Sequence, residues 1–169
     1  MINHQELRDS FKPEIIKVLF IAEAPPENDT FFYSAKSFLY GYTKQVFYEF
    51  FKEEIDSSSV FLKFFQNKGC FLDDLCHQPK TFKEIRSNKE SYIKGLKERL
   101  ELYKPRAVII TPIRIVDFVK TAIACSNLKN YLNNDLIFPL YFAGNGWQNE
   151  YMSGLRSVLN DLILKNILT

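Results

Sequence analysis

A carboxylate and a group of aromatic side chains lie close together near the start of the chain. Glu23 begins the sequence EAPP directly after an apolar run, and Phe31, Phe32 and Tyr33 follow in the same segment. A carboxylate at the end of an apolar run is a polar group that can meet a ligand, and aromatic rings supply flat surfaces for stacking. The candidate site residues of this segment are therefore Glu23, Pro25 and either Phe32 or Tyr33.

Two later segments carry further polar groups. The apolar run CFLDDLC contains Asp73 and Asp74, and because neighbouring residues of a strand point to opposite faces, only one of them can serve a given face. We choose Asp73 as the substrate-binding residue. The sequence Gly144-Asn145-Gly146 follows another apolar run, and its backbone amides could bind an anion. Gly144, Asn145 and Gly146 are therefore also candidate substrate-binding residues.

These candidates lie at the ends of short apolar runs that alternate with helical patterns. The runs are rich in β-branched or aromatic residues and are bounded by breakers, which predicts strands. The predicted strands cover 15–22, 70–75, 106–110 and 136–142, and the predicted helices cover 35–52, 60–67, 88–103, 113–125 and 147–166. In the helix over 35–52, Ser34 is the predicted N-cap. Its predicted inward stripe is Phe38, Tyr42, Val46 and Phe50.

The order of the elements predicts an α/β fold, a three-layer α/β/α sandwich with a four-stranded parallel sheet. Crossovers between parallel strands are right-handed and place helices on both faces of the sheet. A chain of 169 residues fits one domain, spanning residues 1–169. Ligands of such sheets bind at the carboxyl ends of the strands, where the candidate loops converge.

Composition narrows the class of protein. A hydrophobic fraction of 46% and a net charge of +2 indicate a globular chain that tolerates, but does not require, a polyanionic partner. No apolar run could span a bilayer and the first residues lack a hydrophobic signal region, so we expect a cytoplasmic protein without membrane contact. Cys70, Cys76 and Cys125 form no CxxC pair, and His4 and His77 lie far apart. We expect reduced thiols in the core and no metal site.

The segment EAPP with its downstream FFY resembles the GEAPG segment and aromatic residue of the iron–sulfur class of uracil-DNA glycosylases. FLDDLCHQP is similar in place to the strand whose Asn reads the base, and KPRAVIITP resembles the strand after it, so the resemblance extends over about 15–162. It implies a uracil-DNA-glycosylase-like fold and a DNA-repair hydrolase. The implied reaction is hydrolysis of the N-glycosidic bond of a damaged or deaminated base in DNA, without a cofactor.

The same resemblance implies roles for single residues. Glu23 would be the catalytic residue that positions water, and Phe32 or Tyr33 would stack on the extruded base. Asp73 and Asn145 would contact that base, and Pro25 would also belong to the substrate site. The implied partner is DNA, single-stranded or damaged, and we expect a monomer.

The chain also departs from this family. It has three cysteines rather than the four that bind the cluster, and Phe138-Pro139-Leu140 stands where most members have His-Pro-Ser. An aspartate in place of the family's asparagine accepts hydrogen bonds rather than donating them, which predicts a base other than plain uracil. Two alternatives remain: a catalytically inactive nucleic-acid-binding member of the same fold, and a nucleobase- or nucleotide-binding protein.

The candidate residues have ordinary structural interpretations as well. Glu23 can be a solvated loop residue or cap a helix, and the aromatic cluster is as suited to anchoring its loop as to stacking. Asp73 in a buried strand needs a partner. Cys76 and His77 are neighbours in an extended segment and point to opposite faces, so they are not predicted to act as nucleophile and base.

Overall fold

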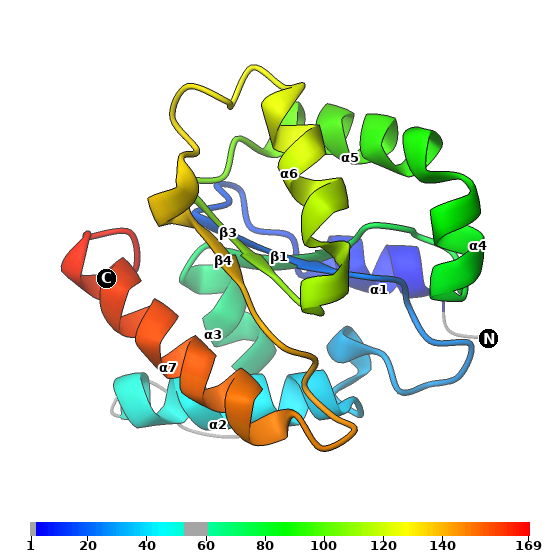
Figure 1. Ribbon diagram of the computed structural model, residues 1–169. Coiled ribbons are helices and arrows are strands. Elements are labelled where there is room, and N and C mark those ends of the chain that lie inside the picture. Colours follow the sequence, from blue (N-terminus) through cyan, green and yellow to red (C-terminus); the bar gives the residue numbers. More distant parts are fainter. Residues whose placement is uncertain (1–2, 53–60) are drawn as a thin grey trace.

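The computed structural model describes residues 3–52 and 61–169 and has a parallel β-sheet at its centre (Figure 1). The strands are β1 (Val18–Ala22), β2 (Cys70–Asp74), β3 (Ala107–Ile110) and β4 (Ile137–Pro139). Their order in the sheet is β2-β1-β3-β4, and every neighbouring pair is parallel. The predicted four-stranded parallel sheet is confirmed.

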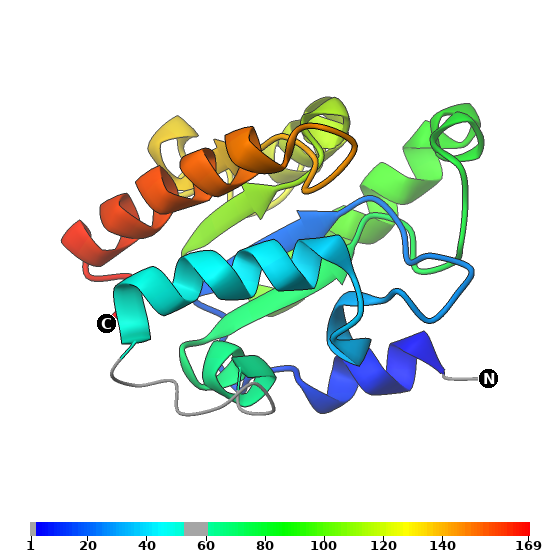
Figure 2. The same cartoon turned by 90° about the horizontal axis from the view of Figure 1, so that it is seen from below.

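Helices cover both faces of the sheet, which gives the predicted three layers. Helices α5 and α6 lie on one face, and α2, α3 and α7 lie on the other (Figures 1 and 2). The helices are α1 (His4–Ser10), α2 (Phe38–Phe51), α3 (Phe61–Asn67), α4 (Phe82–Ser87), α5 (Lys89–Tyr103), α6 (Val116–Ala124) and α7 (Gln148–Leu164). Short 3-10 turns are η1 (Phe32–Ser34), η3 (Ile113–Ile115) and η4 (Asn134–Leu136).

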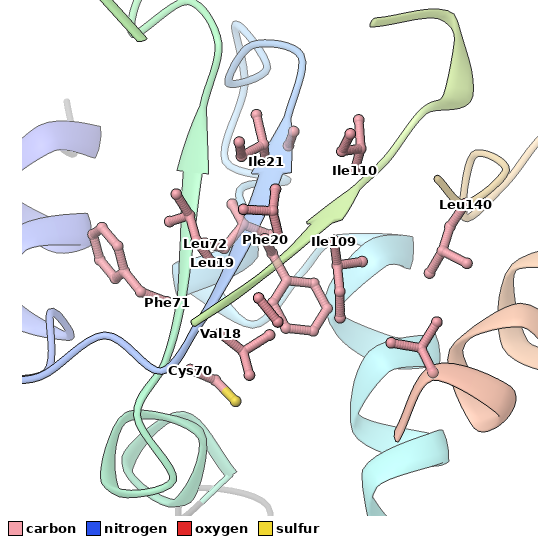
Figure 3. Packing of buried hydrophobic residues seen from close by; sticks show 14 of the residues in the cluster. Val18, Leu19, Phe20, Ile21, Cys70, Phe71, Leu72, Ile109, Ile110 and Leu140 are labelled. Carbon is pink, nitrogen blue, oxygen red and sulfur yellow. The ribbon is translucent and has the colours of Figure 1, made fainter. Parts of the chain in front are cut away.

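The core is densest around β1, whose sequence VLFIA is buried at every position. Such a continuous apolar run is what a strand covered on both faces requires. Phe20 and its register partner Ile109 point to the same side of the sheet, toward α2 (Figure 3). The Phe20 ring packs 5.2 Å from the ring centre of Phe65 in α3. Truncating Phe20 to Ala would cost about 3–5 kcal/mol of stability.

Helix α2 begins later than the sequence pattern predicts. Ala35 takes a left-handed backbone conformation with φ 61°, which separates η1 from the helix. Ser37, not the predicted Ser34, is the N-cap, and its hydroxyl accepts a hydrogen bond from the Tyr40 amide. The predicted stripe is wrong at Phe38, which is 72% exposed, whereas Val46 is buried and Tyr42 and Phe50 are partly buried against the core. The residues of α2 that are buried are Tyr40, Thr43, Val46, Phe47 and Phe51.

Other differences lie at the ends of elements. Strand β4 ends at Pro139, so Tyr141 and Phe142, predicted to be in the strand, are exposed in the following loop. Helices α1 and α4 were not predicted. Cys70 and Cys76 are buried as expected, whereas Cys125 is exposed because it follows the last turn of α6. Val60, the predicted start of the helix over 60–67, lies outside the described residues.

Candidate functional site

A cleft of about 420 Å³ opens at the carboxyl ends of β1, β2 and β3. Its position agrees with the general rule for ligand sites in parallel sheets. The loop that leaves β1 and the first turn of α2 lie beside each other at this end of the sheet (Figure 2). Most of the lining is apolar, and it comes from the β1 loop, η1, the start of α2 and the ends of β2 and β3. The lining residues are Ala22, Glu23, Ala24, Pro25, Pro26, Thr30, Phe31, Phe32, Lys36, Ser37, Phe38, Leu39, Leu72, Asp74, Thr111, Pro112, Arg114 and Phe142.

Glu23 lines this cleft and forms a two-pronged ion pair with Arg114. The Arg114 Nε donates to Oε2 at 2.5 Å, and Nη2 donates to Oε1 at 2.6 Å. The Glu23 side chain is 14% exposed, whereas that of Arg114 is 56% exposed. The Arg114 guanidinium also lies 4.9 Å from the centre of the Phe82 ring. Such a fork fixes the orientation of the carboxylate.

Asp74 is the acidic residue of β2 that lines the cleft. Its carboxylate accepts a 2.7 Å hydrogen bond from Nη2 of Arg8, a fully buried residue of α1. Burial raises the pKa of Asp74 to about 6, although the Arg8 charge opposes the rise, and the nearby Asp73 carboxylate adds to it. The Nη1 of Arg8 finds no hydrogen-bond partner among the described residues. Asp74 can therefore hold a proton at mildly acidic pH and donate it into the cleft.

Asp73, the residue chosen from the sequence, does not line the cleft. Its side chain is fully buried and accepts bonds of 2.7 Å from Arg99 Nε and from the Nε2 side of His77. Arg8 Nε lies 3.7 Å from Oδ1 of the Asp73 carboxylate. Burial acts to raise the pKa of Asp73, but the His77 hydrogen bond and the Arg99 charge outweigh it and hold that pKa below its ordinary value. Its surroundings are those of a paired structural carboxylate, since the alternation of the strand turns it away from the cleft.

The predicted aromatic residues separate into two environments. Phe32 lines the cleft but is only 3% exposed, and Pro25 lines it as well. Tyr33 does not line the cleft, because its hydroxyl donates to the Leu72 carbonyl at 3.0 Å and accepts from the Leu72 amide at 2.8 Å. Of the two alternatives, only Phe32 is in place to touch a ligand in the cleft.

The glycine-rich loop after β4 contributes through a different residue from those predicted. Gly144 is buried, and Asn145 and Gly146, both with positive φ, are exposed and lie outside the cleft lining. Phe142 is the residue of this segment that lines the cleft. A Cβ at position 144 would lie 3.0 Å from the Phe142 ring, so the glycine leaves room for that ring.

The cleft residues that were not predicted as site residues include Lys36, Phe38, Arg114 and Phe142. Lys36 and Arg114 stand in the sequence among many similar surface cations. Arg114 is separated from Glu23 by 91 positions. The available signal was its place directly after the third predicted strand and the Thr-Pro that ends it, because loops at that position converge on the site.

Within 3–52 and 61–169, no group of three or more His, Cys, Asp or Glu side chains could hold a metal ion. No helix in the same ranges is long and apolar enough to cross a membrane. The fold and the cleft thus define a three-layer α/β protein. Its site lies at the carboxyl edge of the sheet and is largely apolar, with a few charged groups in the lining. Comparison of the sequence with protein-family models and with curated proteins finds no match.

Proposed function

We propose that this protein is a DNA-glycosylase-like enzyme that hydrolyses the N-glycosidic bond of a damaged or deaminated base. The observation that carries the proposal is a pair of carboxyl groups on adjacent strands that border one aromatic-walled cleft. Asp74 is the last residue of β2 and the register partner of Ala22, and Glu23 directly follows β1. Both side chains line the same cleft.

The environments of the two carboxyl groups suit complementary roles. Asp74, with a pKa of about 6, can give its proton to the departing base. Glu23, whose side chain Arg114 orients, can stabilise the positive charge that develops on the sugar. The C1′–N bond breaks with its electron pair going to the base, and the base takes the proton from Asp74. Water then adds to C1′ and releases a proton, which regenerates the acid.

The walls of the cleft suit a flat, partly apolar group. Phe31, Phe32, Phe38 and Phe142 line it, and a cavity of about 420 Å³ is within the range of small-ligand sites. An extruded base binds by stacking and by hydrogen bonds to its edge. Asp74 lies at the end of β2 and can accept a hydrogen bond from a ring N–H or an exocyclic amine, or donate one when protonated.

The test is base release from single- and double-stranded oligonucleotides that carry uracil, hypoxanthine, xanthine or an alkylated base. Alkali cleavage at the abasic site reports the product. We expect release that Glu23→Gln and Asp74→Asn each reduce by about 10²-fold or more, whereas Glu49→Gln, at an ion pair outside the cleft, leaves it unchanged. Release should also fall about tenfold per pH unit above pH 6, as Asp74 loses its proton.

A second candidate is a nucleic-acid-binding protein of the same fold without catalysis. The ion pair of Glu23 with Arg114 favours it, because a carboxylate fully occupied by a guanidinium is less available to a substrate. Binding of the same oligonucleotides without release of any base would support this candidate and refute the enzyme.

A further inference from the structure

Two cationic side chains line the otherwise largely apolar cleft. Arg114 follows β3, and Lys36 precedes α2. Lys36 is exposed and makes no hydrogen bond or ion pair with another described residue. It is followed by the first turn of α2, which contains no acidic residue and whose N-terminal dipole favours anions. Both positive charges therefore line one cleft, which has room for a sugar or a base beside them.

The Arg114 guanidinium is oriented but not enclosed. Phe82 lies against the group, and Glu23 accepts one hydrogen bond from Nε and one from Nη2. An arginine carries five N–H donors, so three remain directed away from Glu23, and more than half of the side chain is exposed. A planar guanidinium fork binds phosphate in the same two-pronged way as it binds a carboxylate. The group is therefore prepared for a second anion.

We propose that Arg114 and Lys36 form a subsite for a phosphate group of the substrate, and that Arg114 exchanges Glu23 for this phosphate when the substrate enters. In the free protein, Glu23 occupies the guanidinium and neutralises it. When phosphate takes its place, the Glu23 carboxylate becomes free to face the sugar. This last step rests on the proposed function, whereas the exchange of anions on Arg114 does not.

The exchange has a signature that a purely structural ion pair lacks. If Glu23 competes with phosphate, removing its charge must strengthen phosphate binding, while removing the charge of Arg114 must weaken it. The two partners of one ion pair then give changes of opposite sign. If the pair only braces the loop, both substitutions loosen the same structure and change binding in the same direction.

The experiment measures binding of deoxyribose 5-phosphate to the full chain by NMR titration, with uncharged deoxyribose as the reference. We expect Arg114→Gln to weaken binding about tenfold or more and Lys36→Gln to weaken it a few-fold. We expect Glu23→Gln to strengthen it about three- to tenfold. In the wild-type protein, the Nε–H resonance of Arg114 should shift on addition of the phosphate and not on addition of deoxyribose.

A second exposed ion pair provides the matched control. Arg156 donates to Glu49 with the same fork, at 2.6 Å from Nε and 2.8 Å from Nη2, and neither residue lines the cleft. Arg156→Gln and Glu49→Gln should leave phosphate binding unchanged. Equal changes at the two pairs, or weaker binding in Glu23→Gln, would overturn the proposal.

The source of the phosphate is resolved by comparing a monoester with a diester. The diester probe is a dinucleoside monophosphate, and its methylphosphonate analogue lacks the negative charge. Tighter binding of the diester than of its analogue and of the sugar phosphate assigns the subsite to a nucleic-acid strand, and the reverse order assigns it to a free nucleotide. Equal binding of the diester and its uncharged analogue, with no binding of the monoester, refutes the subsite. Base release is not needed for any of these results, so a failed glycosylase assay leaves this test intact.

Discussion

Asp73 and Asp74 are consecutive, almost completely buried residues of one strand, yet their pKa values move in opposite directions. Asp73 accepts hydrogen bonds from Arg99 and His77, and these outweigh the effect of burial. Asp74 has Arg8 as its charged partner and an apolar cleft in front of it, so burial dominates. The comparison shows that the number of cationic partners, not depth, decides which of two buried acids keeps its proton.

The largest expected effect is the difference in stability between Asp73→Asn and Asp74→Asn. Asp73→Asn should lower the free energy of unfolding by about 3–5 kcal/mol, because it leaves buried and half-buried cations without their carboxylate. Asp74→Asn should lower it by about 1 kcal/mol or less, because the charge is disfavoured there and the amide oxygen can still accept from Arg8. Urea unfolding at pH 7 measures both. Equal losses of unfolding free energy in the two variants would contradict the difference between the two carboxyl groups.

The dependence of stability on pH should show the same contrast. The folded protein keeps the Asp74 proton up to about pH 6, whereas the unfolded chain releases it near its ordinary pKa of 3.8. The folded state therefore binds more protons in this window, and the Asp74 contribution to stability falls as pH rises from about 4 to 6. The lowered pKa of Asp73 acts below this window, where its stabilisation is lost on acidification.

Denaturant unfolding at pH 4.5 and pH 6.5 checks this expectation. Between these values, wild type should lose about 1–3 kcal/mol relative to Asp74→Asn, in which the titrating group is absent. Parallel curves for the two proteins across this range would contradict the raised pKa.

Tyr33 makes a buried side-chain contact with the middle of β2, which a substitution can test. Tyr33→Phe removes the hydroxyl that serves both the amide and the carbonyl of Leu72, and we expect a loss of about 1–3 kcal/mol. Tyr131→Phe, at a side chain that is 44% exposed, is the matched control and should change stability little. Thermal unfolding of the two variants gives the comparison.

The smallest effect is expected at the outer partner of Asp73. His77 is 30% exposed, and Arg99 and Arg8 remain beside the carboxylate when it is replaced. His77→Gln should therefore cost about 1 kcal/mol or less, and the loss should be reduced further when combined with Asp73→Asn. A double-mutant cycle in urea measures the coupling. The same loss of unfolding free energy with and without Asp73→Asn would mean that His77 stabilises the fold through contacts other than Asp73.

The layers and the alternation of strands with helices follow from patterns that the sequence displays. The runs at Val18–Ala22 and Ala107–Ile110 are apolar at every position, which identifies strands covered on both faces. The stripe of Tyr151, Leu155, Leu159 and Leu162 identifies α7. Helix α1 was missed because its buried residue is Arg8, and a charged side chain is normally counted as exposed.

The site was predictable in place but not in detail. The turn after β1 fixed Glu23 and Pro25 at the carboxyl edge of the sheet, where the cleft lies. The alternation of β2 limited the choice to one of two acids without saying which face the cleft occupies. That answer depends on α1 and α5, which supply Arg8 and Arg99 from distant parts of the chain. Long-range pairing of charges leaves no periodic trace in a sequence.

The hydroxyl of Tyr33 has a consequence for how separate copies of this chain can meet. Strand β2 is the last strand on its side of the sheet, and such a strand normally presents unpaired amides and carbonyls that can template a strand from another molecule. At Leu72 both of these groups are already bonded to one tyrosine oxygen. An incoming strand would have to displace a buried ring to pair there, so a single side chain protects this margin of the sheet against aggregation.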